Sequence, residues 1–318
     1  MSKKCLVTGA RGFIGSHLVN YLKGKGYYVR SVDNKDFSYL KTNEDEFKQL
    51  DLRVAENAKI AVRGMDRVFN LAANMGGIQY ISEYNASIMR DNVLINVNML
   101  DAAHEEGVER YFFSSSACAY PRELQTVTDV TPLKESDVLP AHPDSAYGWE
   151  KLFTELLCAS YKNDYKLPVR VARFHNIYGA YTTYKGGQEK APAAVCRKIA
   201  EAKNGDTVEI WGDGQQTRSF LNVKDCVEAI LLLTESDYSE PMNIGTDRLI
   251  SILDLYKMVA RIAGKEVKYR FDLTKPQGVR GRNADLTLIK KVLRWEPKIS
   301  LEAGMKELYD WVSKQLKC

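Results

Sequence analysis

Short hydrophobic runs alternate with longer amphipathic segments over the first half of the chain. The runs are rich in β-branched and aromatic residues, as buried strands are, and the segments between them repeat apolar residues at helical spacing. The runs predict strands at residues 4–8, 28–33, 49–52, 67–71, 110–114 and 169–174. The segments predict helices at residues 13–23, 54–62, 87–106 and 147–163. This alternation predicts an α/β fold with a Rossmann-like, doubly wound parallel sheet.

The pattern loosens after about residue 176. Residues 178–190 are loop-like and rich in Gly, Thr and Tyr, and the next runs predict a helix, two strands, a helix and a strand. Their ranges are 191–202, 207–210, 219–222, 223–234 and 241–244. The remaining residues are mostly helical. We therefore expect two interleaved domains: 1–176 plus about 219–244 form the sheet domain, and about 177–218 plus 245–318 form a smaller, mostly helical α+β domain.

Composition and charge are those of an ordinary soluble globular protein. Apolar residues make up 45% of the chain and charged residues 27%. The 45 Lys and Arg exceed the 41 Asp and Glu by only four, and they are spread evenly, so we expect no nucleic-acid partner. The N-terminal residues lead into a strand almost at once, which predicts no signal peptide, transit peptide or membrane span.

The six cysteines stand at positions 5, 118, 158, 196, 226 and 318, without CxxC pairs or an accompanying His cluster. We therefore expect neither a metal site nor a disulfide framework, and a reducing, cytoplasmic location. Most of them should be small buried hydrophobic residues. Cys118 follows three serines at the end of a strand, so its thiol has four readings: packing, a disulfide, a metal ligand or a catalyst.

A glycine-rich turn, TGARGFIGS, joins the first strand to the first helix. Gly9, Gly12 and Gly15 permit a tight turn, close approach of a pyrophosphate, and close helix–strand packing, respectively. The N–H groups of the helix start, at Phe13 and Ile14, would then face the phosphates. Taken alone, such a triplet also fits plain tight turns.

Three later positions extend this cofactor prediction. Asp33 ends the second strand, where a carboxylate binds the ribose 2′-OH of NAD and repels the 2′-phosphate of NADP, although a turn residue is the simpler alternative. Asp51 and Leu52 are expected to end the third strand near the adenine. Ala72 is expected at the end of the fourth strand, where it would leave room for the cofactor.

Tyr147 and Lys151 stand four residues apart in SAYGWEK, which places them on one face of a helix. A phenol has a pKa near ~10, and a neighbouring ammonium or the positive nicotinamide of NAD⁺ favours the phenolate. Alone, the pair also fits an ordinary helix surface. Together with the glycine turn and the serines that end at Ser116, it indicates acid–base chemistry beside a dinucleotide.

The motifs TGARGFIG, SSSA, YGWEK and RFHNIYG resemble those of the extended short-chain dehydrogenase/reductase family, over nearly the whole chain. The resemblance implies NAD in the sheet domain and a sugar nucleotide in the smaller domain. It implies that Tyr147 takes a proton from a sugar hydroxyl beside Lys151, and that Ser116 bonds the same oxygen. By analogy, two long helices would pair with their copies in a homodimer.

SSSACAYP, KGGQEKAPAAVCRK and GVRGRNAD narrow the resemblance to family members that epimerise GDP-mannose at C3 and C5. In those enzymes a thiol and an ammonium serve as base and acid, which points to Cys118 and Lys190. The resemblance also implies substrate contacts at Gly76, Asn176, Glu189, Lys198, Gln215, Arg218 and Arg280.

Simpler readings of these positions stay open. Arg218 and Arg280 also fit surface salt bridges, Asn176 fits a turn cap and Gly76 a plain turn. The chain departs from its relatives at Arg11, in place of a glycine, at Ala119, in place of a larger apolar residue, and at Gln188, in place of a basic residue. Two other functions remain: a C4 epimerase or dehydratase of another nucleotide sugar, and a non-catalytic NAD-binding sensor.

Overall fold

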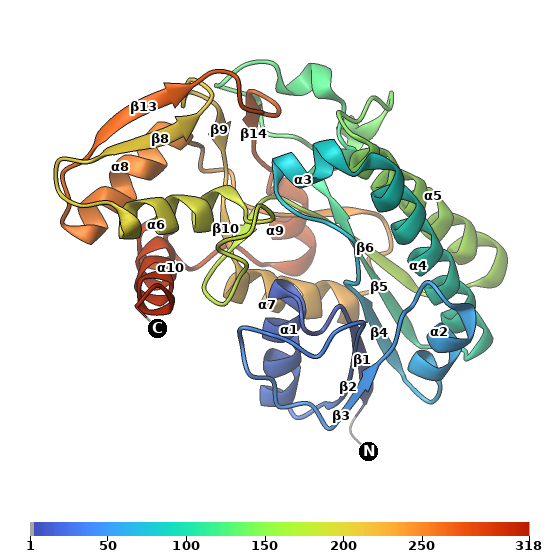
Figure 1. Ribbon diagram of the computed structural model, residues 1–318. Helices are drawn as coiled ribbons and strands as arrows, with labels where there is room; N and C mark the ends of the chain where they lie inside the picture. Colours follow the sequence, from blue (N-terminus) through green and yellow to red (C-terminus); the bar gives the residue numbers. More distant parts are fainter. Residues whose placement is uncertain (1–2, 318) are drawn as a thin grey trace.

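The computed structural model describes residues 3–317. Its centre is a seven-stranded sheet in the order β11-β6-β5-β4-β1-β2-β3, in which every neighbouring pair is parallel (Figure 1). The strands are β1 (Lys4–Thr8), β2 (Tyr28–Asp33), β3 (Glu46–Gln49), β4 (Arg67–Asn70), β5 (Arg110–Ser116), β6 (Val169–Phe174) and β11 (Met242–Ile244).

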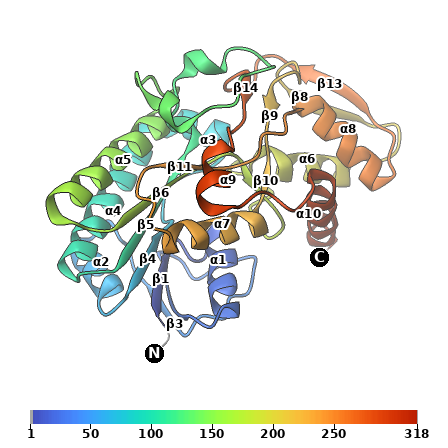
Figure 2. The same ribbon diagram turned by 180° about the vertical axis from the view of Figure 1, so that it is seen from behind.

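Helices cover both faces of this sheet (Figures 1 and 2). On one face α1 (Phe13–Gly24) packs against α7 (Val223–Glu235). On the other, α4 (Asn85–Glu105) packs between α2 (Ala55–Val62) and α5 (Ala146–Tyr165), and the short helix α3 (Ile78–Glu83) precedes it. The predicted doubly wound α/β fold is therefore confirmed.

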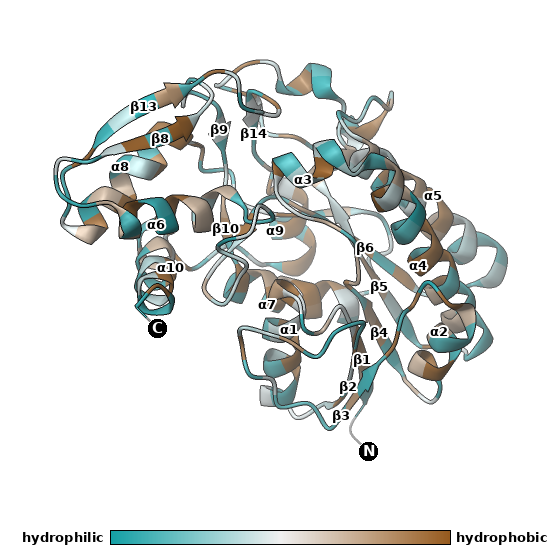
Figure 3. Cartoon of the chain, viewed as in Figure 1, coloured by the Kyte–Doolittle hydropathy of each residue, from teal (hydrophilic) through white to brown (hydrophobic). Residues whose placement is uncertain are grey.

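The sheet is buried because both of its faces are covered, as is usual for parallel sheets. All four residues of β4 are buried, and so are the last four of β1. Separate apolar clusters lie on the two faces, one that includes Leu18 and Ile230 and one that includes Met99 and Tyr111. Figure 3 shows hydrophobic colour along the central strands and α7, with hydrophilic colour on the outer helix surfaces.

The predicted position of the third strand was wrong. It was expected at residues 49–52, whereas β3 spans Glu46–Gln49. The strand lies at the edge of the sheet and its sequence, EFKQ, is largely polar and none of its residues is fully buried, so hydrophobicity does not mark it. Leu52 misled the prediction because it is buried in the core beyond the end of the strand, at 4% exposure.

The rest of the chain forms a second layered unit beside the sheet. Its three long helices are α6 (Ala191–Glu201), α8 (Ile252–Ala263) and α10 (Leu301–Gln315), which share one apolar cluster. The parallel pair β8 (Thr207–Trp211) and β13 (Lys268–Asp272) covers them on one side. Four shorter strands connect this unit with the sheet: β7 (Ile177–Tyr178), β10 (Leu221–Asn222), β12 (Ile250–Ser251) and β9 (Thr217–Arg218).

Two further elements complete the connection. The strand β14 (Gly281–Arg282) pairs with β9, which also pairs with β12. The helix α9 (Thr287–Leu293) returns to the sheet, where Ile289 joins the apolar cluster on the α1 and α7 face. The predicted division into two domains stays a prediction.

The order of the strands reverses between β1 and β4. In a doubly wound sheet, ligands bind in the crevice at the carboxyl ends of the strands at this point. Thr8, the last residue of β1, ties the two strand ends together: its Oγ1 lies 2.9 Å from Asn70 Oδ1 and accepts the N–H groups of Leu71 and Ala72, each at 3.1 Å. The floor of the crevice is thus fixed by hydrogen bonds.

Candidate active site

The glycine turn lies at this crevice and fits a pyrophosphate. Gly9 has φ +64°, and its carbonyl accepts the N–H of Gly12 at 3.0 Å. A Cβ on Gly15 would lie 2.1 Å from the same carbonyl oxygen, so only glycine allows this packing. The helix α1 begins at Phe13, and its first N–H groups have no partner within the helix. The cradle therefore offers donors and the positive helix end to an anion.

Asp33 is held towards the glycine turn. Its Oδ2 accepts the N–H of Arg11 at 2.9 Å, and its Oδ1 accepts the N–H of Lys35 at 3.2 Å. Each carboxylate oxygen has a further lone pair, so the group can also accept a ribose hydroxyl. The glycine turn and this carboxylate together fit NAD.

The other predicted cofactor contacts have partners within the protein. Asp51 follows the end of β3 and forms an ion pair with Arg53 at 2.7 Å. The carbonyl of Leu52 accepts the side-chain N–H of Asn98 at 3.0 Å. Ala72 lies directly against the glycine turn, because a Cβ on Gly9 would be 3.0 Å from its Cα. Their contact with an adenosine stays a prediction.

Tyr147 and Lys151 lie on α5 beside the end of β5. They are 7% and 2% exposed, and Lys151 Nζ lies 5.5 Å from the centre of the Tyr147 ring. Burial raises the pKa of Tyr147 well above its usual value, the nearby Cys118 and Glu150 add to the rise, and a hydrogen bond with Ser116 opposes it. A phenolate here therefore needs positive charge nearby, which Lys151 provides.

Cys118 lies in a short 3₁₀ turn, Ala117–Ala119, that packs on the start of α5. A Cβ on Gly148 would lie 2.2 Å from the Cys118 carbonyl oxygen, so the glycine brings the turn next to Tyr147. The N–H of Cys118 donates to Ser116 Oγ at 3.1 Å. Ser116, Cys118 and Tyr147 are thus brought together.

The sequence prediction missed Arg282, which donates from Nη1 to Cys118 Sγ at 3.2 Å. Arg282 lies on β14 and is 6% exposed; it also donates to Gln125 and lies 3.6 Å from an Asp144 oxygen. A guanidinium donor stabilises a thiolate. No local pattern in GVRGRNAD marks this arginine, because its approach to Cys118 depends on the pairing of β14 with β9.

Lys190 lies half-buried at the N-terminus of α6, and no described residue pairs with its ammonium. Burial lowers the pKa of Lys190, and the charge of Cys118 opposes that shift. The two groups are therefore close enough to interact electrostatically. A lysine of lowered pKa exchanges a proton more readily near neutral pH than an ordinary one.

Lys190 ends a segment, residues 185–190, which we call the strap; its first four residues are exposed and its last two are half-buried. The strap meets the turn that follows β4: the N–H of Gly77 donates to the Gln188 carbonyl at 3.0 Å. A Cβ on Gly77 would lie 2.4 Å from the Glu189 carbonyl oxygen. A Cβ on the neighbouring Gly76 would lie 2.8 Å from Tyr80 Cβ. This contact fixes Lys190 relative to the sheet.

Two arginines differ in their pairing. Arg218 is directly opposite Arg282 in the β9–β14 register and has no carboxylate partner within 4.0 Å among the described residues. Burial lowers the pKa of Arg218 to about 9, and the Arg282 charge contributes. Arg280 instead forms an ion pair with Asp213 at 3.0 Å, so the salt-bridge reading fits it. The unpaired positive charge at Arg218 suits an anionic ligand.

Most of the remaining residues predicted to contact the substrate already bond with other groups of the protein. Asn176 has φ +46° and donates to the Ser219 carbonyl at 3.0 Å. The Glu189 carboxylate lies 3.0 Å from Arg197 Nη2 and anchors the strap. Lys198 donates to the Glu209 carbonyl at 2.9 Å, whereas the side chain of Gln215 is exposed. Their roles towards a substrate stay predictions.

The five cysteines that the structure describes are free thiols, and Cys318 lies outside the described residues. Within residues 3–317 no three His, Cys, Asp or Glu side chains are grouped to hold a metal ion. Over the same residues no helix has the length and apolar character needed to cross a membrane.

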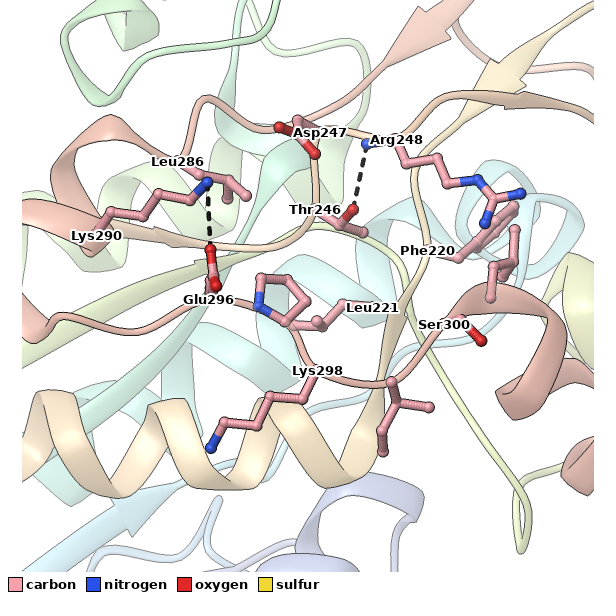
Figure 4. Close-up of a pocket in the computed structure, with 13 residues that line it drawn as sticks. Phe220, Leu221, Thr246, Asp247, Arg248, Leu286, Lys290, Glu296, Lys298 and Ser300 are labelled. Carbon is pink, nitrogen blue, oxygen red and sulfur yellow. Dashed lines mark hydrogen bonds and ion pairs between the residues drawn. The ribbon is translucent and has the colours of Figure 1, made fainter.

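A separate cavity of about 300 Å³ lies between the start of α10 and the loop after β11 (Figure 4). None of the predicted site residues lines it. Its cations are already paired: Arg248 with Glu302, Lys290 with Glu296 and Lys298 with Glu228. The cavity therefore offers no free positive charge to an anionic nucleotide, and the crevice remains the candidate active site.

The sequence matches the NAD dependent epimerase/dehydratase family over residues 5–245. The chain belongs to this family. Its cofactor, NAD, is the one that the glycine turn and Asp33 fit.

Named relatives agree with this membership. GDP-mannose 3,5-epimerase of Arabidopsis thaliana is 46% identical over 316 residues, which cover 99% of this chain and 83% of that protein. GDP-mannose 3,5-epimerase 1 of Oryza sativa subsp. japonica is 47% identical over 315 residues, covering 98% and 82%. Both therefore span nearly all of this chain.

Solved structures of similar proteins share the fold over nearly the whole chain. The UDP-glucose 4-epimerase of Thermotoga maritima, solved with UDP-glucose, is 30% identical with a TM-score of 0.86 and covers 98% of this chain and 99% of its own. The UDP-glucuronic acid 4-epimerase of Bacillus cereus, solved with UDP-glucuronic acid and NAD, is 26% identical with a TM-score of 0.83, covering 98% and 99%.

Proposed function

We propose that this member of the family is an isomerase that inverts GDP-D-mannose at C3 and C5 to give GDP-L-galactose, with GDP-L-gulose as the product of C5 inversion alone. The observation that carries the proposal is the position of Cys118, whose sulfur accepts a guanidinium hydrogen bond and which interacts electrostatically with Lys190. A single C4 inversion requires no such second acid–base pair. The relatives named GDP-mannose 3,5-epimerase support the same choice.

The first task is to oxidise the sugar at C4. Tyr147 takes the proton of the C4 hydroxyl, Ser116 donates a hydrogen bond to the same oxygen, and Lys151 stabilises the phenolate. Bound NAD would supply the hydride acceptor for the oxidation and, once reduced, the hydride donor for the return step, so no cofactor would be consumed. The buried Tyr147 and Lys151 keep this exchange out of water.

The second task is proton exchange at the neighbouring carbons. A ketone at C4 makes the hydrogens on C3 and C5 acidic, because an enolate spreads the charge of the carbanion. Cys118, as thiolate beside Arg282, withdraws a proton from one face of the ring, and the ammonium of Lys190 delivers one to the other. After each inversion the two groups re-equilibrate their protons, so the net change is stereochemical only.

The remaining residues hold the nucleotide part of the substrate. We infer that Arg218, with Arg280 at the rim, binds the diphosphate, and that Gly76, Asn176, Glu189, Lys198 and Gln215 shape the rest of the site. Arg218 lacks a carboxylate partner, so its charge is free for a phosphate oxygen. The sheet domain, 1–176 plus about 219–244, would hold NAD, and the rest of the chain the sugar nucleotide.

We also propose a homodimer in the cytoplasm. Several large apolar side chains of α4 and α5 are exposed, among them Leu94, Phe153 and Leu156 at 42%, 46% and 59%. The two helices lie side by side on the outer face of the sheet (Figure 1). A second copy of this chain, offering the same apolar pair, suits such a surface. Free thiols fit a reducing compartment.

Incubation of purified protein with GDP-mannose, with products resolved by NMR, tests the substrate. The proposal predicts GDP-L-galactose, and Cys118→Ala is expected to abolish its formation. A C4 epimerase or dehydratase would instead not invert the configuration at C3 and C5, and its activity would tolerate Cys118→Ala. A protein that binds NAD and turns over no nucleotide sugar would be a sensor.

A further inference from the structure

Arg11 stands in the glycine turn directly before Gly12, beside the Asp33 carboxylate that accepts its N–H. In dinucleotide-binding folds an acidic residue at the end of the second strand selects NAD, whereas an arginine nearby accommodates the 2′-phosphate of NADP. This chain therefore has both features at one site: Asp33 favours NAD, and Arg11 could accommodate the 2′-phosphate of NADP. The partners of the Arg11 guanidinium determine whether it is available to bind that phosphate.

The Arg11 guanidinium is already engaged by the segment between β2 and β3. Its Nε lies 3.0 Å from Asp36 Oδ1, and its Nη1 lies 2.8 Å from Glu44 Oε1. Its carbon lies 3.9 Å from the centre of the Phe47 ring, and the side chain is only 11% exposed. The guanidinium thus forms two ion pairs, lies over an aromatic ring and is largely shielded from solvent.

Glu44 is ionised in this arrangement. Burial alone would raise the pKa of Glu44, but hydrogen bonds from Thr42 and Arg11 outweigh it, so the pKa is lowered. Two carboxylates, those of Asp36 and Glu44, therefore pair with one guanidinium, and a third, that of Asp33, accepts the backbone N–H of the same residue. A phosphate dianion brought to Arg11 would meet net negative charge and would have to displace two ion pairs.

We propose that Asp36 and Glu44 form an acidic clamp that withholds Arg11 from the cofactor and thereby sets selectivity for NAD over NADP. Asp33 supplies direct recognition of the ribose hydroxyl, and the clamp removes the competing phosphate site. The inference rests on NAD as the cofactor and is independent of which sugar nucleotide the enzyme converts. Its failure would leave the epimerase proposal untouched.

The clamp can be opened without loss of the surrounding structure, because the segment has other anchors on α1. Asn20 donates to the Lys41 carbonyl at 2.9 Å and accepts the N–H of Asn43 at 3.0 Å. Lys23 forms an ion pair with Asp45 at 2.7 Å. Figure 1 shows this segment running alongside α1. Removing the clamp carboxylates therefore frees Arg11 while the segment stays in place.

Dissociation constants for NAD and NADP, measured by calorimetric titration of protein freed of co-purified nucleotide, test the clamp. The wild type is expected to prefer NAD, and Asp36→Asn with Glu44→Gln to reduce that preference by about tenfold through tighter NADP binding. Adding Arg11→Ala to this double variant is expected to reverse the gain. The last variant shows that the gain passes through the freed guanidinium.

Asp45→Asn is the matched control, because it removes a carboxylate of the same segment that pairs with Lys23 and not with Arg11. It is expected to leave the NAD-to-NADP ratio unchanged. Asp36→Asn alone, at a residue whose side chain is 63% exposed, gives a smaller shift in the same direction without risk to folding. An unchanged ratio in the opened variants, or a gain that survives Arg11→Ala, would overturn the proposal.

Discussion

Cys118 depends on an arginine 164 positions away in the chain. Because Arg282 donates to its sulfur, Arg282→Gln removes this donor and should slow alkylation of Cys118 by iodoacetamide about tenfold at neutral pH. Epimerisation should fall at least as far. Arg280→Gln is the control, since Arg280 pairs with Asp213 and does not touch the thiol. Equal alkylation rates in the two variants would contradict this role.

We expect the ammonium of Lys190 to lower the free energy of unfolding, because burial disfavours its charged form. The pKa of Lys190 is lowered in the folded protein, so the unfolded chain binds the proton more tightly. The loss of stability is therefore complete below the folded pKa. It disappears as the pH rises through the pKa of the unfolded chain, near ~10.4. Lys190→Met should therefore raise the unfolding midpoint at pH 7, by about 1–2 °C, and by less at pH 10. The exposed neighbour Lys185 is the control, and a lower midpoint for Lys190→Met would contradict the argument.

For single residues, the sequence predicted those features that depend on one short segment of the chain. Tyr147 and Lys151 share a helix face by spacing alone, and Ser116 ends a strong strand. Arg282 was missed because its proximity to Cys118 depends on the pairing of β9 with β14, and no local pattern announces that register.

Among the structural elements, the strap is held by its contact with the turn after β4. Gly77→Ala would place a methyl group 2.4 Å from the Glu189 carbonyl oxygen, so the strap and Lys190 must shift. We expect turnover to fall about 10- to 100-fold with little change in unfolding temperature. Gly24→Ala, where a Cβ meets nothing within 4 Å, should leave turnover unchanged. Normal turnover in Gly77→Ala would show that the strap contact is dispensable.

The elements themselves were predictable where burial is complete. The central strands carry continuous apolar runs, and their predicted positions agree with β1, β4 and β6 to within a residue or so. The edge strand β3 was misplaced because an edge is only half buried. The two-residue strands β9, β12 and β14 are too short to leave any periodic signal.

For the whole molecule, the proposed dimer gives a direct prediction. Phe153→Glu with Leu156→Glu places charge on the exposed apolar face of α5 and should convert a dimer of about twice 36.0 kDa to a monomer. Light scattering after size-exclusion chromatography measures the mass. Leu232→Glu, at a 40% exposed position on the opposite face of the sheet, should leave the dimer intact. A wild type that runs as a monomer would contradict the proposal.

The central claim is that Cys118 and Lys190 exchange protons at two carbons of one transiently oxidised sugar. Its most direct measurement is NMR of GDP-mannose incubated with the protein in heavy water. The wild type should introduce deuterium at both C3 and C5, whereas Cys118→Ala and Lys190→Met should each suppress inversion. Deuterium at neither carbon, or full exchange in the Cys118→Ala variant, would contradict the account.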